Sequence, residues 1–254
     1  MHIGREIIIS SYYQIDLILP LHLITYSFVI LQIYEILLDF CLYQVYYINN
    51  YVKKVCLVKI LKLNAIKKTF FGFQDISNAL GITYASAQVT AHRYVQNGML
   101  IRIKPNIFVL AEKWNNFSSE EKYQTANLLQ VPSYVSLTTA LEYYEITTQI
   151  QRNYIECISI RRTFSKKIRE LSIRFSKVSE KLYFGFEKRN NVYIALPEKA
   201  LIDALYLASF GRYSLDIAAV SKNRFDQKIL SRMLETYPLR TKNLMRKYGF
   251  ISPS

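Results

Sequence analysis

The stretch that decides the fold reads QDISNALGITYASAQVTAHRYVQNGMLIRIKPNIFVL and covers Gln74–Leu110. Its first part places apolar residues on one helical face and ends at Gly81, the residue type that most readily takes the left-handed position closing a helix. Thr83 then offers a hydroxyl that can cap the start of a second helix, Tyr84–Asn97. The pattern therefore predicts two short helices joined by a tight turn.

The second of these helices has an apolar face and a polar face. Ala87, Ala91 and Tyr94 are spaced at i, i+4 and i+7, so they share the face expected to pack inward. The opposite face carries hydrogen-bonding side chains, and a helix of this kind fits a DNA major groove, where each base pair presents its own donor and acceptor pattern. Any one of these residues taken alone is better explained as an ordinary surface residue. The candidate contact residues are Thr83, Tyr84, Ser86, Gln88, His92 and Arg93.

A hairpin is predicted directly after this helix. Met99–Leu110 alternates between apolar and polar residues around a Lys104–Pro105–Asn106 turn. Arg102, Lys104 and Asn106 are expected near its tip, where cations suit phosphate contacts. With a short helix expected at Val58–Lys67, the order of elements predicts a winged helix-turn-helix over residues 55–112. Winged helices also serve as protein-docking modules, and that alternative stays open.

Charge and cysteine usage narrow the class of protein. The 254 residues carry a net charge of +14, which indicates nucleic acid first and an anionic membrane surface second. The three cysteines and three histidines are scattered, with no CxxC pair, so neither a disulfide framework nor a metal site is expected. No cofactor is expected, and the unpaired thiols favour a reducing cytoplasm.

Residues 1–54 differ from the rest of the chain. They contain three cations and four carboxylates, so the basic excess lies entirely after Lys54. Leu17–Tyr34 is uncharged and near the lower length limit for a membrane span, although Pro20 and His22 interrupt it. The segment is interpreted as a hydrophobic helical extension of doubtful origin: translated upstream sequence, a membrane tether, or hydrophobic helices of a soluble protein.

Residues 113–254 predict a mixed α+β domain. Helices are expected to begin at Ser118 and Ser136, and at Pro197, Phe225 and Leu239, with a further one over Leu215–Ser221. Strands are expected at Tyr154–Arg162, Leu171–Val178, Lys181–Phe186 and Val192–Leu196, with a turn at Asn190–Asn191. The whole chain is thus expected to be α+β.

Two charged groups in this domain have competing interpretations. Glu198, Lys199 and Asp203 could form a site, but a helix cap and an i,i+4 ion pair explain them more simply. A basic cluster could extend a DNA surface, dock an acidic partner or be an ordinary solvated loop; it comprises Arg161, Arg162, Lys166, Lys167 and Arg169.

Together these stretches resemble the AbiEi antitoxin family of type IV toxin–antitoxin systems. The resemblance covers roughly Val55–Phe250. It is carried by Asp75–Leu110, by VPSYVSLTTALEYYEI, and by the run from YFGF to VYIALPEKALIDALYLA. It implies an abortive-infection antitoxin that binds inverted repeats in its own promoter, represses its operon, and counteracts a neighbouring nucleotidyltransferase-like toxin. Many relatives have a basic residue where this chain has Tyr84, which puts site choice in doubt.

Three functions therefore compete. The first is the DNA-binding repressor and antitoxin, which is not an enzyme. The second is a metal-dependent nucleotidyltransferase or nuclease, which would need clustered carboxylates; no P-loop, HExxH or paired-aspartate motif is present, and Asp203 with Asp216 is a weak pair. The third is a regulator tethered to the membrane through Leu17–Tyr34.

Overall fold

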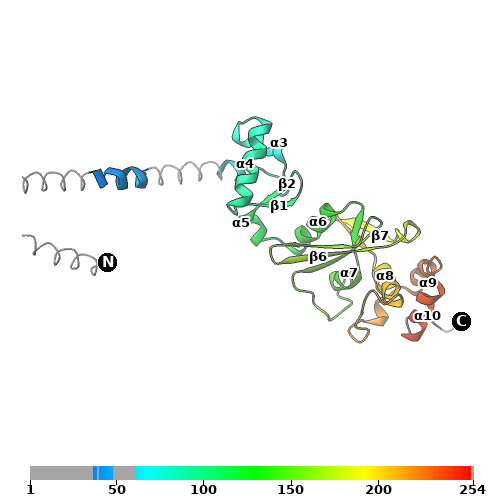
Figure 1. Ribbon diagram of the computed structural model, residues 1–254. Helices are drawn as coiled ribbons and strands as arrows, with labels where there is room; N and C mark the ends of the chain where they lie inside the picture. The colour runs from blue at the N-terminus through cyan, green and yellow to red at the C-terminus, as the bar shows by residue number, and fades with distance from the viewer. Residues whose placement is uncertain (1–36, 39, 48–60, 253–254) are drawn as a thin grey trace, which may run out of the picture. The chain divides into compact units, whose positions relative to one another are not determined.

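The structure, a computed structural model, describes residues 37–38, 40–47 and 61–252 (Figure 1). Residues 1–63 and 64–254 form two compact units. In the first unit, residues 37–38 and 40–47 are helical and exposed. Within the part of the chain that the structure covers, no helix has both the length and the apolar character to cross a membrane. The candidate tether Leu17–Tyr34 lies outside the described residues.

The second unit begins with two helices and a hairpin. Helices α3 (Phe73–Leu80) and α4 (Tyr84–Gln96) are followed by antiparallel strands β1 (Leu100–Lys104) and β2 (Ile107–Leu110). Gly81 adopts the expected left-handed conformation between the helices, with φ 66° and ψ 40°. Of the helix expected over Val58–Lys67, residues 61–64 are helical and residues 66–68 are not, while the earlier ones are outside the described range.

A single bridge ties the chain before α3 to this hairpin. The backbone N–H of Phe71 donates to the Phe108 carbonyl at 3.1 Å, and the Phe108 N–H donates back at 2.8 Å. The hairpin is buried on both sides, because Leu100 and Phe108 are as buried as the expected inward residues Ile103 and Val109. We call α3, α4, β1, β2 and the bridging residue together the helix–hairpin module, residues 64–110.

Two helices follow the hairpin. The short α5 (Ala111–Asn115), which the sequence pattern did not predict, buries Trp114. Helix α6 (Ser119–Leu129) begins where expected: Ser118 accepts from the Glu121 N–H at 3.3 Å, and the Glu121 carboxylate accepts from the Ser118 N–H at 3.0 Å. This reciprocal pair satisfies two backbone donors that a helix start would leave without partners.

A six-stranded mixed sheet forms the centre of the remaining chain, in the order β5-β6-β4-β3-β8-β7. The β3–β8 and β4–β6 pairs are parallel and the other pairs are antiparallel. The strands are β3 (Ser133–Val135), β4 (Tyr154–Ser159), β5 (Phe164–Ile168), β6 (Leu171–Lys177), β7 (Phe186–Arg189) and β8 (Val192–Ala195). The α+β class is thereby confirmed.

Helices cover this sheet. Figure 1 shows α6 on one side and α7 (Leu137–Tyr143) with α8 on the other. Helix α8 (Pro197–Ser209) starts at the predicted proline and is buried nearly all round, because α7, α9 (Gln227–Leu234) and α10 (Leu239–Lys247) pack against it as well as the sheet. One hydrophobic core runs through sheet and helices and includes Ile101, Trp114 and Phe175.

Two expected elements are wrong. Lys181–Phe186 is not a strand: Glu180–Leu182 forms a 3-10 turn (η1), and Gly185 at φ +71° turns the chain so that the strand starts only at Phe186. Leu215–Ser221 is not a helix, because its backbone bonds to a distant segment instead of to itself. The Ser221 N–H donates to the Ile146 carbonyl at 2.8 Å. A second short 3-10 turn, η2, follows at Lys222–Arg224.

Candidate functional site

The outward face of α4 is the first candidate surface. Thr83 caps the helix by accepting from the Ser86 N–H at 3.2 Å, as expected. Ala87, Ala91 and Tyr94 are buried, together with Thr90, so the helix is held by one narrow stripe. The six residues predicted to contact DNA from this helix and its cap are all exposed: Thr83, Tyr84, Ser86, Gln88, His92 and Arg93.

Val89, at the centre of that exposed face, was not among the predicted contact residues. Opposite the buried stripe lie Ala85, Val89, His92 and Gln96, at i, i+4, i+7 and i+11, and the side chain of Val89 is 60% exposed. Simple helical periodicity identifies this row. Tyr84 is further to one flank, with its ring edge against Phe73 at a centroid distance of 5.9 Å. The face is therefore a largely polar surface with the apolar side chain of Val89 at its middle.

The hairpin tip is more constrained than expected. Arg102 is exposed and Lys104 is half-buried. Asn106, predicted as a contact residue, adopts a left-handed conformation with φ 58°, and its side-chain oxygen accepts from the Phe73 N–H at 2.7 Å. It therefore satisfies one of the unpaired donors at the start of α3. A structural role accounts for Asn106 whether or not it also contacts a ligand.

The start of α3 holds the module's one carboxylate in place. Asp75 accepts from the Gly72 N–H at 2.9 Å and pairs with Lys68 at 2.7 Å. The backbone bond, followed by the bond from Lys68, lowers the pKa of Asp75 below its ordinary value. The module carries five cations, Lys67, Lys68, Arg93, Arg102 and Lys104, against this single acid. The module accordingly carries a net positive charge.

The basic cluster of the second domain is a strand and its turn, not a loop. Lys166 and Lys167 lie on the edge strand β5 and are exposed, while Arg161 and Arg162 lie before it. At the β5–β6 turn, Arg169 donates to Asn115 Oδ1 at 3.2 Å and approaches the Gly98 carbonyl at 3.5 Å. The cluster is thus attached through Arg169 to Gly98, two residues beyond the end of α4.

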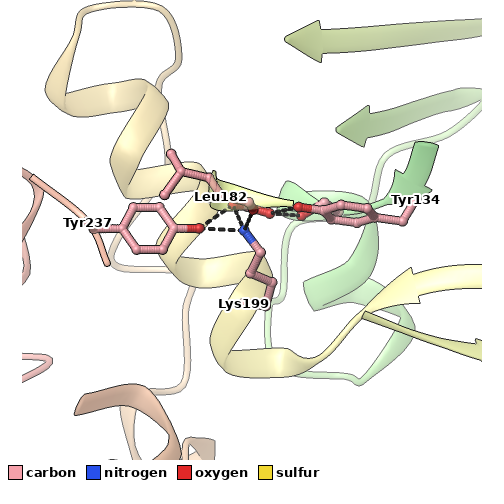
Figure 2. Close-up of polar contacts among 6 residues, drawn as sticks. Tyr134, Leu182, Lys199 and Tyr237 are labelled. Atoms are coloured by element: carbon pink, nitrogen blue, oxygen red, sulfur yellow. Dashed lines mark hydrogen bonds and ion pairs between the residues drawn. The ribbon is translucent and has the colours of Figure 1, made fainter. Parts of the chain in front are cut away.

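A second candidate is the polar cluster around Lys199 (Figure 2). Lys199 forms an ion pair with Asp203, and both side chains are 0% exposed. The Lys199 ammonium also donates to the Leu182 carbonyl at 2.8 Å and to the Tyr237 hydroxyl. The same hydroxyl donates to Asp203 at 2.8 Å, and Tyr134 donates to the other carboxylate oxygen at 2.9 Å.

This cluster is sealed from solvent. Its ammonium lies 4.9 Å from the centroid of the Phe184 ring, among aromatic side chains. Burial lowers the pKa of Lys199, opposed by the charge of Asp203, and burial also raises the pKa of Tyr134. The ion pair predicted from sequence is confirmed. Glu198, however, does not cap its own helix: its carboxylate accepts from the Asp226 N–H at 2.9 Å, which anchors the start of α9.

Glu156 is at the centre of another buried network. Tyr213 donates to its carboxylate at 2.7 Å and Gln151 does so at 3.2 Å. Burial raises the pKa of Glu156, and these two hydrogen bonds oppose the rise. Among the residues that the structure describes, no group of histidine, cysteine and carboxylate side chains could hold a metal ion.

The comparisons with known proteins return little. No family model matches the chain, and no curated protein matches it. Among solved structures, the RV2827C protein from Mycobacterium tuberculosis is similar at 9% identity, over 75% of each chain, with a TM-score of 0.46.

Proposed function

We propose that the chain is a DNA-binding repressor and antitoxin of the AbiEi type, whose helix–hairpin module acts as a winged helix-turn-helix. One observation carries the DNA-binding part. The exposed face of α4 presents Gln88, His92 and Arg93 beside a hairpin with Arg102, and the single acid of the module, Asp75, is already engaged. In this proposal α4 enters the major groove, and the hairpin contacts the flanking backbone.

The order of the elements supports the same role. A bridge strand, two helices and an antiparallel hairpin follow one another, and the turn between the helices is fixed by Gly81 and Ile82. Val89 then takes the position from which an apolar side chain can contact the methyl group of thymine. Arg93 and Arg102 supply phosphate contacts, which set the register of the protein on the duplex without selecting its sequence.

The antitoxin part rests on the family resemblance. The two more specific stretches that carry it meet in one place: Tyr134 comes from the first, and Lys199 and Asp203 come from the second. Their side chains build the buried cluster that joins β3, α8 and the segment after α9. The partner expected for this domain is a nucleotidyltransferase-like toxin encoded beside it, and its basic edge strand β5 suits an acidic surface.

Binding of labelled duplex from its own promoter, followed by fluorescence anisotropy at several salt concentrations, tests the DNA-binding part. Affinity should fall steeply with salt, because each phosphate contact releases a counterion and adds about 0.9 to the slope of log K against log salt. A duplex carrying the inverted repeats should bind more tightly than a scrambled one. Equal affinity for both, or no binding at low salt, would contradict the proposal.

Val89 also favours a second candidate, a protein-docking module, because an exposed apolar side chain in the middle of a polar face can anchor a partner. Val89→Lys separates the two. A docking surface with a charge at its centre loses its partner, whereas a DNA surface gains a phosphate contact. We expect the variant to bind arbitrary duplex more tightly than the natural protein does, with less preference for the inverted repeats.

A further inference from the structure

A large hollow lies where the segment before α3 meets the sheet and α6. Its volume is about 520 Å³, which is within the range of small-molecule sites. Phe70 comes from the helix–hairpin module, Leu128 from α6, Pro132 from the turn before β3, and Phe186 and Tyr193 from β7 and β8. The hollow is therefore built from three parts of the chain that are distant in sequence: residue 70, residues 124–133 and residues 183–193.

The lining of this hollow is aromatic and uncharged. Its rings are those of Phe70, Tyr183, Phe186 and Tyr193, and its aliphatic side chains are Leu128, Val131 and Pro132. The remaining lining residues are amides and a serine: Gln124, Asn127, Asn191 and Ser133. No Lys, Arg, Asp or Glu is among the described lining residues, although the chain as a whole carries +14. Such a lining favours a neutral ligand over an anion or a cation.

One polar group in the wall lacks a partner. The side-chain oxygen of Asn127 accepts from the Tyr193 N–H at 2.7 Å, and this bond fixes which end of the amide is the oxygen. The amide nitrogen is buried, and nothing in the described part of the chain accepts a hydrogen bond from it. A buried donor without an acceptor is unfavourable. In the proposed complex, a small movement of the Asn127 side chain toward the hollow would bring this nitrogen to an acceptor atom on the bound molecule.

The rings of the hollow contact one another at steep angles, with 60° between Tyr183 and Phe186. Tyr183 and Phe186 lie with centroids 4.8 Å apart, and Tyr193 presents its ring to Phe186 at 6.3 Å and an interplanar angle of 77°. Tyr193 is 43% exposed and Val131 is 64% exposed, so both lie at the rim and can admit a ligand without opening the core. A planar aromatic ring can join such a cluster through further edge-to-face contacts.

We propose that this hollow binds a neutral, planar aromatic small molecule carrying a hydrogen-bond acceptor, which the Asn127 amide nitrogen recognises. The site is separate from the exposed face of α4, so it does not depend on whether the module binds DNA. Partial aromatic surfaces of this size are also filled by apolar side chains of partner proteins, and the experiment distinguishes that occupant because it uses isolated small molecules.

The test is calorimetric titration of the full chain with two probes. Coumarin is flat and neutral and has a carbonyl acceptor, while naphthalene has nearly the same shape and no acceptor. We expect both to bind saturably at one site, with coumarin the tighter. Absence of saturable binding by either probe would overturn the proposal and leave a partner's side chain as the occupant.

Two variants identify the site. Asn127→Asp keeps the oxygen that accepts from Tyr193 but removes the donor, so the preference for coumarin over naphthalene should fall about fivefold, the ratio corresponding to one neutral hydrogen bond. Val131→Trp fills the rim and should weaken both probes more than tenfold.

Leu239→Trp is the matched control for the rim variant, because Leu239 is 66% exposed at the start of α10 and does not line the hollow. It should leave both affinities unchanged. Thermal unfolding of each variant verifies folding. Unchanged coumarin preference in Asn127→Asp, or unchanged affinity in Val131→Trp, would overturn the assignment.

Discussion

Lys199 and Asp203 lie one turn apart on α8 and form an ion pair from which solvent is excluded on every side. Three hydroxyl groups, from Tyr134, Ser136 and Tyr237, complete the carboxylate's hydrogen bonds. Desolvation opposes the formation of such a pair, so the intact pair contributes little net stability. Removing only one partner leaves an uncompensated buried charge, and this causes a large loss in the free energy of unfolding.

Lys199→Met should therefore reduce the free energy of unfolding by about 3–5 kcal/mol. Adding Asp203→Asn removes the stranded charge while keeping an oxygen that accepts from the hydroxyls, so the double variant should recover part of the loss. Urea denaturation measures both. Lys228→Met, at an exposed cation on α9, is the control and should change stability by less than about 0.5 kcal/mol. Additive losses in the double variant would argue against a coupled pair.

The effect of Glu156→Gln on the free energy of unfolding should become progressively more favourable, relative to the natural protein, as the pH rises. Burial raises the folded-state pKa of Glu156 above its unfolded value, so the folded state binds the proton more tightly. The stabilisation from that proton is complete below pH 4.5 and is lost as the pH rises through the folded-state pKa. Glutamine, which does not ionise, avoids this loss.

The measurement is the difference in unfolding free energy between Glu156→Gln and the natural protein at pH 4.5, 6 and 7.5. We expect the stability of Glu156→Gln relative to the natural protein to increase across this series. Glu180→Gln, at an exposed carboxylate, controls for the general effect of removing one negative charge. A difference that stays constant with pH would show that Glu156 has the same proton affinity folded and unfolded.

Arg93→Ala and Arg102→Ala should weaken DNA binding about equally on all sequences. Each removes one expected phosphate contact, so each should reduce the slope of log K against log salt by about 0.9. Gln88→Ala should behave differently: it should reduce discrimination between the inverted repeats and a scrambled duplex without changing that slope.

Fluorescence anisotropy with both duplexes separates these effects. Arg232→Ala, at an exposed cation on α9, is the charge-matched control, because it lies outside the helix–hairpin module. A slope lowered as much by Arg232→Ala as by Arg93→Ala would mean that net charge, and not the module, determines binding.

Variants of Asn106 should distinguish two contributions to stability, the strain of the left-handed backbone and the hydrogen bond that caps α3. Asn106→Gly accepts the left-handed backbone but loses the bond to the Phe73 N–H, at a cost of about 0.5–1.5 kcal/mol. Asn106→Ala loses the same bond and adds left-handed strain of about 1–2 kcal/mol. Asn106→Asp keeps the acceptor and should be close to the natural protein in stability.

Thermal and urea unfolding should therefore rank these proteins as natural and Asp variant, then Gly, then Ala. Gly72→Ala offers an independent check on the same contact, because a Cβ there would lie 2.9 Å from the Asn106 side-chain oxygen and 3.0 Å from its carbonyl. Equal stability of the Gly and Ala variants would show that the left-handed conformation carries no strain.

The sequence predicted those elements whose signals are local. The inward face of α4, the caps at Thr83 and Ser118 and the proline start of α8 each depend on residues within one or two turns, and all are confirmed. The predictions were less accurate where a contact with a distant segment decides the backbone conformation. The segment 215–221 is apolar enough for a helix, but its backbone pairs with residues 146–148 instead.

Two strands were missed for a similar reason. Strand β3 has three residues, too few for an alternating pattern to stand out, and exists because β4 and β8 flank it. Strand β5 reads FSKKI, and its exposed lysines suggest a loop. Charged side chains are typical of edge strands, where they discourage pairing with other chains. Neighbouring lysines therefore could not distinguish an edge from a loop.

The candidate site was predicted in part. The exposure of the α4 residues was predicted from helical periodicity. The same periodicity places Val89 at the centre of the face, but the contact residues were chosen for their polarity and Val89 was therefore not among them. The structural role of Asn106 could not be predicted, because its partner Phe73 lies 33 residues earlier in the chain. The hollow around Asn127 likewise depends on segments that only the folded chain brings together.

The bond from Phe73 to Asn106 has a geometric consequence for the proposed DNA binding. It fastens the hairpin tip to the start of α3, which packs against α4, so in that proposal the spacing between α4 and the tip is set before any DNA arrives. A DNA duplex bound in the proposed way would therefore have to adjust its shape to this fixed spacing. Local bendability would thus weigh in the choice of operator, even at base pairs that no side chain reaches.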